Sequence, residues 1–309
     1  MLLRTLRAAA PAAPSRAVVV AALALALAAV PRPLAAQDLL AQARALYDRG
    51  RLDSALTIIR RAAEQEPNRA EAHYWLGMIA GRRAQNSGGL GRITNASRSK
   101  AGFSRAVQLN PNNPDYLEGL VMFLGNAPGL FGGNRDSAIV LAERVRRLDE
   151  VRGTFLLANL LRRGTDCQRP RAVSLVDAIS RSRLGDRRVQ IGAAQYFAGT
   201  QRPDRALPLY ERVAARDSTD LVARYGVARN LVVLLRDPRR AQGILRWVIA
   251  NNPRTGDERI EPAAPWWRLG QTWVQLGQPD SARTAYQHSL EVNARFEQAR
   301  RSLDSLSRR

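Results

Sequence analysis

Arginine offers most of the chemistry in this chain, because it supplies nearly all of the positive charge. Only Lys100 among the 48 lysines and arginines is a lysine, and the formal net charge is +21. From Ala72 to Pro114 there is no Asp or Glu. Guanidinium groups bind carboxylates and phosphates, so this stretch predicts an anion-binding edge. Its expected cations are Arg82, Arg83, Arg92, Arg98 and Lys100. The alternative is a solvated face that acids from elsewhere in the fold balance.

Residues of other types give little support for catalysis. The run GGLG at 88–91 follows no strand pattern and precedes no G-K-[ST], so it is no nucleotide-binding loop. Cys167 is the single cysteine and is expected in a helix–helix turn, while His73 and His288 lie far apart without metal-ligand spacing. No serine-hydrolase elbow or zinc-protease motif occurs. We therefore expect no enzyme, no cofactor and no metal, and a hydrolase with unrecognised residues is a weak alternative.

The elements that must position these arginines are expected to be helices. The chain has 309 residues, 45% hydrophobic and 24% charged, with only 6% aromatic residues. Alanine, leucine and arginine have high helix propensity, and they dominate over β-branched and aromatic residues. The balance of apolar and charged residues is that of a folded chain.

The N-terminal 36 residues have the layout of a secretory signal peptide. Arginines precede an uncharged run from Ala17 to Val30, and small residues follow at Ala35 and Ala36. A spanning helix needs about 20 apolar residues, so a retained anchor is the weaker alternative. Cleavage is expected after Ala36, to within a residue or two. The mature chain would then be exported, to the periplasm or beyond, without a membrane span, and its partners would not be nucleic acid.

An internal repeat organises the rest of the chain. The clearest unit, AAPWWRLGQTWVQLGQPDSARTAYQHSLEVNARF, runs from Ala263 to Phe296. Its pattern is W-x2-L-G-x2-W-x3-G and then A-x3-Y, so it resembles the tetratricopeptide repeat (TPR). Small Gly270 and Ala282 would let two helices approach closely. Aromatic residues at these spacings are expected in the core. They are Trp266, Trp273, Tyr210 and Tyr286.

The same frame recurs through most of the chain. Small residues occupy its helix-packing places at Ala43, Ala138, Ala194 and Ala228, for example. The resemblance implies an all-α, right-handed TPR α-solenoid of about seven helix-turn-helix repeats over residues 37–294. A C-terminal capping helix is expected over residues 295–309.

Two repeats carry insertions between their helices, near residues 84–98 and 126–135. We expect both to lengthen turns and to lie beside each other at one edge of the solenoid. Insertions on one face of a repeat array often mark its binding face. The block from Glu71 to Gly153 also resembles a group of bacterial TPR proteins with an APG-x2-GG loop in this place. That resemblance implies architecture and no activity.

The concave groove lined by the first helices is the other expected binding surface. Its residues mix aromatic, methionine and polar side chains, which suits an extended peptide or polymer. They are Arg44, Tyr74, Met78, Glu118, Met122, Gln195, Tyr225, Arg229, Trp267 and Gln271. The Lys/Asn set with which chaperone-binding TPR proteins hold a terminal carboxylate does not occur.

The sequence therefore predicts an exported, non-catalytic TPR scaffold that mediates protein–protein interaction in the bacterial cell envelope. The alternative is a module that binds anionic polysaccharide or phosphorylated envelope lipid through the basic edge.

Overall fold

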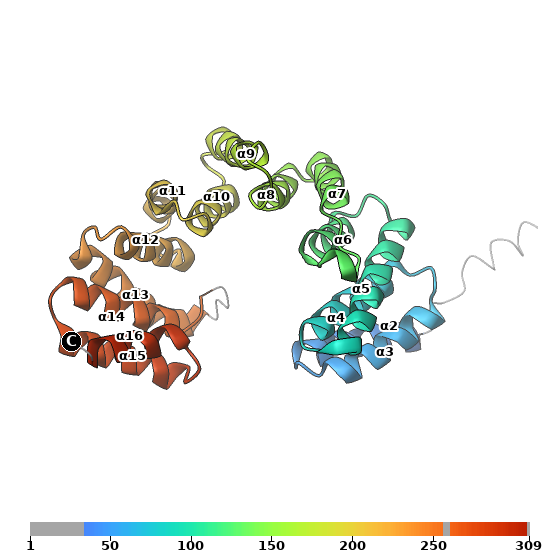
Figure 1. Cartoon of the computed structure of the whole chain (residues 1–309), viewed down its shortest axis with the longest axis horizontal. Coiled ribbons are helices and arrows are strands. Elements are labelled where there is room, and N and C mark those ends of the chain that lie inside the picture. Colours follow the sequence, from blue (N-terminus) through green and yellow to red (C-terminus); the bar gives the residue numbers. More distant parts are fainter. Residues whose placement is uncertain (1–33, 256–259, 308–309) are drawn as a thin grey trace, which may run out of the picture. The chain divides into compact units, whose positions relative to one another are not determined.

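The computed structural model describes residues 34–255 and 260–307 (Figure 1). All regular structure in these ranges is helical, so the all-α prediction is confirmed. The expected signal peptide lies outside the described residues except for Leu34–Ala36, which begin the first helix. The chain divides into two compact units, with the boundary between Pro111 and Asn112.

Unit 1 consists of two helical hairpins. The first pairs α2 (Leu34–Asp48) with α3 (Leu52–Gln65), and the second pairs α4 (Ala70–Gln85) with α5 (Gly89–Leu109). Gly50 makes the first turn with a φ of 72°, a conformation that glycine adopts without steric cost.

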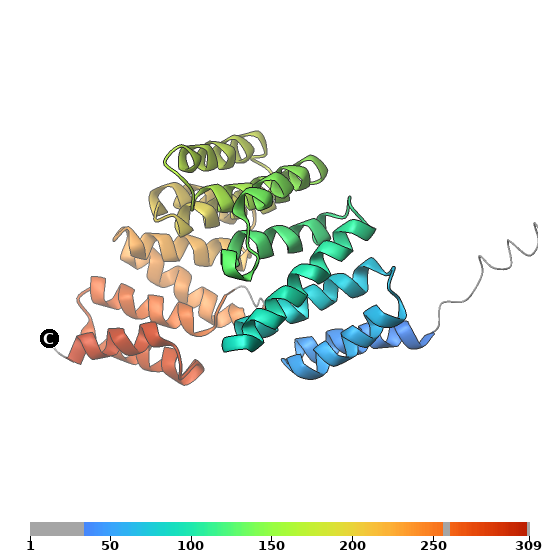
Figure 2. The ribbon, with the colours of Figure 1, turned by 45° about the vertical axis from the view of Figure 1, so that its right-hand side comes forward.

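Unit 2 contains five hairpins and a final helix, stacked in chain order (Figure 2). Its elements are α6 (Pro114–Asn126), η1 (Gly129–Phe131), α7 (Arg135–Leu148), α8 (Glu150–Leu161), α9 (Gln168–Ser182), α10 (Arg187–Gly199), α11 (Pro203–Arg216), α12 (Leu221–Val233), α13 (Pro238–Thr255), α14 (Ala263–Gln275), α15 (Pro279–Val292) and α16 (Glu297–Ser307). The exposed Cys167 lies in the turn before α9, as expected. Helix α16 packs against α15.

Small residues hold the paired helices close together. A Cβ atom on Gly102 would lie 2.7 Å from the backbone nitrogen of Gly77 and 2.7 Å from the carbonyl oxygen of His73. Ser99, also on α5, donates a hydrogen bond of 2.8 Å to the carbonyl of Gly77. Helices α4 and α5 therefore touch through their backbones, which only glycine at position 102 allows.

The aromatic residues of the repeat divide between core and surface. Tyr210 and Tyr286 are buried, each 3% exposed, as predicted. Trp266 and Trp273 are only half-buried. Trp266 stacks on His288 with ring centroids 4.8 Å apart. The two tryptophans thus lie at the margin of the core.

The insertion near residues 84–98 does not form the long turn that the sequence predicts. The turn is confined to Asn86–Gly88, and the added residues extend α5 to 21 residues. Asn95, Ala96 and Ser99 are buried in this extension. Because these small side chains continue the close contact with α4, helix is favoured over an open loop.

The insertion near residues 126–135 is an irregular connection, as predicted. It contains η1 and then Gly132, whose φ is 86°. The backbone N–H of Asn134 bonds to the carbonyl of Leu124 at 2.9 Å, and its side chain caps α7 by accepting from Ser137 N–H. A Cβ on Gly133 would overlap the carbonyl oxygen of Ala127. The connection is therefore folded against the end of α6.

Replacing Gly102 with Ala should lower the free energy of unfolding by about 1–3 kcal/mol, because the methyl group overlaps backbone atoms that cannot rotate away. Gly243 is a matched control, since it lies inside α13 and a Cβ there meets no atom within 4 Å. Gly243→Ala should raise stability by about 0.5–1 kcal/mol through helix propensity. Urea denaturation followed by circular dichroism measures both. Equal effects of the two changes would contradict the close contact.

Candidate binding surface on the first helices

The ten predicted groove residues all lie on the first helices of hairpins. Arg44 is on α2 and Tyr74 and Met78 are on α4, in unit 1. The other seven are on α6, α10, α12 and α14, in unit 2. Arg44, Met122 and Gln195 are exposed, and the remaining seven are half-buried.

In unit 1 the predicted groove residues Arg44 and Tyr74 are engaged within the fold. The Arg44 guanidinium lies 4.8 Å from the ring centroid of Trp75 and 3.6 Å from the Glu71 carboxylate. Tyr74 contacts the ring of Phe103 at 5.8 Å between centroids. These contacts fix the side chains of α2 and α4 in one arrangement.

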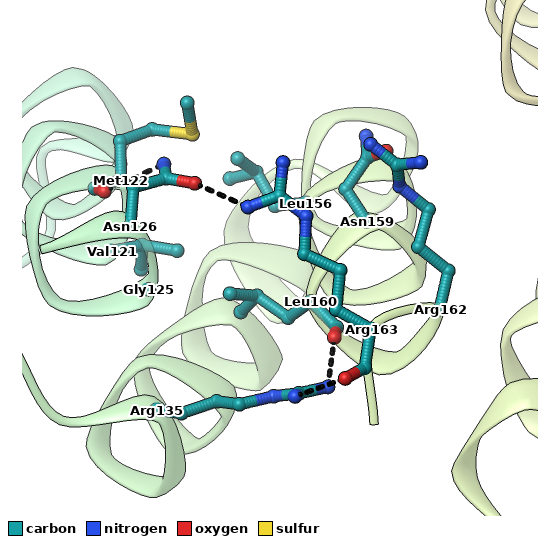
Figure 3. Close-up of a pocket in the computed structure, with 10 residues that line it drawn as sticks. All are labelled: Val121, Met122, Gly125, Asn126, Arg135, Leu156, Asn159, Leu160, Arg162 and Arg163. Atoms are coloured by element: carbon teal, nitrogen blue, oxygen red, sulfur yellow. Dashed lines mark hydrogen bonds between the residues drawn. The ribbon is translucent and has the colours of Figure 1, made fainter. Parts of the chain in front are cut away.

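In unit 2 a cavity of about 280 Å³ opens between α6, α7 and α8 (Figure 3). The predicted groove residue Met122 lines it. The full lining is Val121, Met122, Gly125, Asn126, Arg135, Leu156, Asn159, Leu160, Arg162 and Arg163. Aliphatic side chains and three guanidinium groups thus share one cavity, and none of the lining residues is acidic.

Arg135 closes the cavity at the end of α8. Its guanidinium donates to the carbonyl oxygen of Leu160 and, at 2.7 Å, to that of Arg163. The last carbonyls of a helix lack intrahelical partners and carry partial negative charge. Arg135 therefore stabilises the C-terminus of α8, and its charge is used inside the protein.

The other two arginines of the cavity are less engaged. Arg163 donates to the side-chain oxygen of Asn126 at 2.9 Å, and Asn126 in turn donates to the Met122 carbonyl at 2.8 Å. The Nε of Arg162 is buried without a hydrogen-bond partner in the described part of the chain. Neither arginine forms an ion pair among the described residues. The cavity therefore presents positive charge beside an apolar wall.

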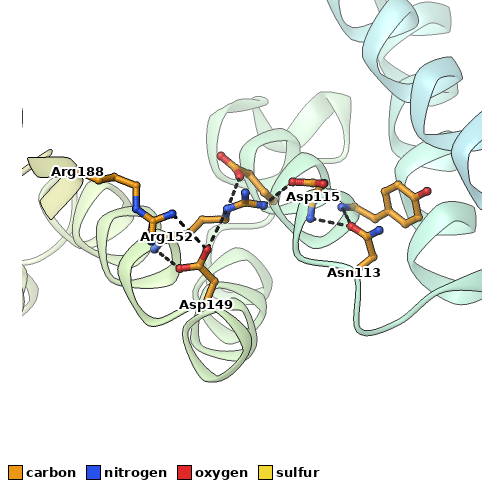
Figure 4. A network of polar contacts seen from close by, with 7 residues as sticks. Asn113, Asp115, Asp149, Arg152 and Arg188 are labelled. Atoms are coloured by element: carbon orange, nitrogen blue, oxygen red, sulfur yellow. Dashed lines mark hydrogen bonds and ion pairs between the residues drawn. The ribbon is translucent and has the colours of Figure 1, made fainter. Parts of the chain in front are cut away.

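An ionic network joins the N-terminal ends of α6, α8 and α10 (Figure 4). Arg152 lies 2.5 Å from Asp115, 3.5 Å from Glu118 and 3.7 Å from Asp149. Arg188 lies 3.9 Å from Asp149. Burial raises the pKa of the Glu118 carboxyl group, although the positive charge of Arg152 opposes this shift. The predicted groove residue Glu118 is thus part of a network between repeats.

The predicted contact residue Trp267 is covered by the C-terminal helix. Its indole N–H donates to Ser302 of α16 at 3.0 Å, and its ring packs against Phe296 at 5.9 Å between centroids. The Arg268 guanidinium also lies over this ring, at 4.2 Å from its centroid, and donates to Gln271 at 2.8 Å. Trp267 is therefore half-buried beside α16.

The predicted anion-binding edge lies on α4 and α5 in unit 1. Arg83 pairs with Asp53 of α3 at 2.5 Å, so an acid from outside the acid-free stretch balances it. Arg92 donates to the Ser87 carbonyl at 2.9 Å, and Arg82 lies over the Tyr47 ring at 5.0 Å. The edge is therefore partly neutralised within unit 1. The insertion near residues 126–135, which was expected to lie beside this edge, belongs to unit 2.

The sequence interpretation missed the cavity residues of α8. It assigned no groove position to this helix, because the repeat pattern there is weak. A shift of 37 residues relates Asn126 to its partner Arg163, and the same shift takes Met122 to Asn159. Applied to the predicted groove residue Met122, that shift would have identified Asn159.

No protein-family model matches the sequence, and no curated protein does. Among solved structures, a tetratricopeptide repeat protein from Parabacteroides merdae aligns with a TM-score of 0.50 at 13% identity, over 88% of this chain and 98% of that one. The described chain has the TPR fold. YrrB, a TPR protein with an unusual peptide-binding site, aligns with a TM-score of 0.42 at 14% identity, over 66% of this chain and 98% of its own. An IFIT1 monomeric mutant with a capped RNA aligns with a TM-score of 0.46 at 16% identity, over 80% of this chain and 58% of its own.

The described residues contain no group of three or more His, Cys, Asp or Glu side chains that could hold a metal ion. Within the same ranges, no helix has both the length and the apolar character that crossing a bilayer requires.

Replacing Glu118 with Gln should stabilise unit 2 at neutral pH. A raised pKa means that the folded state favours the protonated carboxyl group. The stability that protonated Glu118 contributes is lost as the pH rises through its pKa in the folded protein. The stability difference between Glu118→Gln and the unchanged protein should therefore shrink as pH falls and Glu118 becomes protonated. Urea denaturation at several pH values measures it.

Asp115→Asn is the contrasting variant, because the Asp115 side chain is 59% exposed and bonds Arg152 directly. It should lower stability at neutral pH by less than about 1 kcal/mol. If Glu118→Gln were also destabilising there, the ion pair with Arg152 would outweigh the burial of Glu118.

Proposed function

We propose that this chain is a non-catalytic TPR scaffold that binds an extended segment of a protein partner along the first helices of unit 2. The observation that carries the proposal is the cavity between α6, α7 and α8. It includes Met122 of the predicted groove and combines aliphatic walls with guanidinium groups, and no acidic residue lines it. TPR architecture supports a role in protein interaction.

The size of the cavity fits a side chain or two better than a whole small molecule. Sites for drug-sized ligands enclose about 300–1,000 Å³, and this cavity of about 280 Å³ is just below that range. Its rim residues Met122, Asn126, Asn159 and Arg163 are exposed. A peptide crossing α6 and α8 could therefore insert side chains while its backbone stays outside.

The chemistry of the lining favours an acidic residue next to an aliphatic one. Leu156 is buried and Leu160 half-buried, and they offer an apolar wall beside Val121. Arg162 and Arg163 can donate to a carboxylate, and charge-assisted bonds of this kind are roughly twice as strong as neutral ones. Met122 is unbranched and 49% exposed, so it can adapt to different aliphatic side chains.

The ionic network supports binding by fixing neighbouring repeats. Arg152 joins α8 to α6, and Arg188 joins α10 to the start of α8. The first helices are thus held in register before a ligand arrives. A preorganised surface loses less conformational entropy on binding.

A pool of peptides with a fixed Glu-Leu pair should bind more tightly than a matched pool with Gln-Leu, by roughly tenfold, which is about 1.4 kcal/mol. The double variant Arg162→Gln, Arg163→Gln should lose this preference, because these guanidinium groups no longer meet the carboxylate. Fluorescence polarisation on labelled pools measures both.

The matched control is Arg236→Gln, Arg239→Gln, which removes the same charge at exposed positions outside the cavity. It should keep the preference. Equal binding of the two pools, or an equal loss in both double variants, would refute the acidic-segment proposal.

We also propose that the scaffold works outside the cytoplasm, in the bacterial cell envelope. The support is the N-terminal pattern of arginines, apolar run and small residues. Expressed in a bacterial host, the chain should be recovered from the periplasm with Gln37, or a residue within two of it, as its N-terminus. Replacing Leu23 and Leu25 with Arg should block this processing. N-terminal sequencing gives the result, and an intact Met1 on the unchanged chain would contradict export.

A further inference from the structure

The exposed side of helix α5 in unit 1 begins with two large apolar side chains. Leu90 is 82% exposed and Ile93 is 42% exposed, and the small residues Ser97 and Ala101 are exposed after them. At 3.6 residues per turn these four positions lie along one side of the helix, which we call the α5 face. Its first two turns belong to the insertion that the sequence predicted to be a loop, so this face was not visible from the sequence.

The fold holds the α5 face outward. Asn95, Ser99 and Gly102 lie buried on the opposite side of the helix, where Ser99 and Gly102 contact α4. The hydrogen bond from Ser99 to the Gly77 carbonyl and the backbone contact of Gly102 fix the rotation of the helix. Leu90 and Ile93 therefore cannot turn inward without breaking the α4–α5 contact.

Arg98 and Lys100 flank the α5 face, and helix α5 carries no acid. Helix α5 carries Arg92, Arg98, Lys100 and Arg105 and no Asp or Glu. Arg98 donates to the neutral side chain of Asn95, at 3.4 Å, and neither Arg98 nor Lys100 has an ion pair among the described residues. The surface thus combines exposed aliphatic groups with positive charge.

We propose that the α5 face docks on an anionic phospholipid surface. A helix lying in the interface places its apolar side chains at the boundary of the acyl chains and its cations among the headgroups. Each arginine or lysine near an anionic leaflet strengthens membrane binding roughly fivefold. A second copy of this chain is a poor occupant, because it would bring two acid-free cationic surfaces together.

The α5 face belongs to unit 1 and the peptide-binding cavity to unit 2. The α5 face makes part of the predicted anion-binding edge both basic and apolar. The cations alone are partly neutralised, as Arg83 is by Asp53, whereas Leu90 and Ile93 add an apolar component that a soluble polyanion would not use.

The test is co-sedimentation of the full chain with vesicles of phosphatidylcholine, alone or mixed with phosphatidylglycerol, near physiological ionic strength. The chain should sediment with the mixed vesicles and not with phosphatidylcholine alone. Leu90→Gln, Ile93→Gln should weaken partitioning roughly tenfold, because two aliphatic side chains no longer enter the interface. Arg98→Gln, Lys100→Gln should weaken it roughly thirtyfold, because two cations are lost.

Two control variants separate docking from general adsorption of a basic protein. Leu235→Gln removes a leucine that is 75% exposed in unit 2, and Arg236→Gln, Arg239→Gln removes the same charge as the α5 pair. Both should bind as the unchanged chain does. Circular dichroism checks that helix content is retained in every variant.

Four outcomes would overturn the proposal, three of them for a chain that binds vesicles. They are equal binding to neutral and mixed vesicles, undiminished binding of Leu90→Gln, Ile93→Gln, and an equal loss in the control charge variant. Absence of vesicle binding by the unchanged chain also overturns it, and capture of an acidic protein would then be the remaining explanation for the surface.

Discussion

Close contact between paired helices is the constraint on which the rest of this structure depends. At Gly102 the backbones of α5 and α4 touch, and at Gly270 a Cβ would overlap the ring of Tyr286. Interiors are packed as densely as organic crystals, so a residue even one methyl group larger pushes the helices apart. Because the α4–α5 and α14–α15 hairpins are closed in this way on their inner sides, their remaining faces are available to neighbouring repeats and to ligands.

The faces left by this packing differ along unit 2. At one end of α6 and α8, Arg152 and its carboxylate partners tie the first helices together. At the other end, the same two helices leave a cavity whose charge is supplied by Arg162 and Arg163. Helix α16 covers Trp267 in the last hairpin. A ligand would therefore find its best combination of positive charge and apolar surface at α6–α8.

The role of an arginine in this protein depends on its position more than on its charge. Arg135 caps a helix, Arg268 stacks on a tryptophan, and Arg83 neutralises an aspartate. Each of these charges is used within the fold. A formal net charge of +21 therefore says little about where anions bind, since only groups such as Arg162 and Lys100, with no ion pair in the described part of the chain, offer their charge outward.

Local spacing in the sequence was sufficient to predict the helices, their pairing and the small residues between them, because Gly270, Ala282 and their counterparts recur with the period of a hairpin. It also placed the groove residues on first helices. Three other features were decided only by tertiary contacts. The insertion near 84–98 became helix because Ser99 and Gly102 fit against α4, and Trp267 was covered because α16 folds onto it. The cavity formed because the ends of α6 and α8 meet, so residues 37 positions apart, Asn126 and Arg163, became partners.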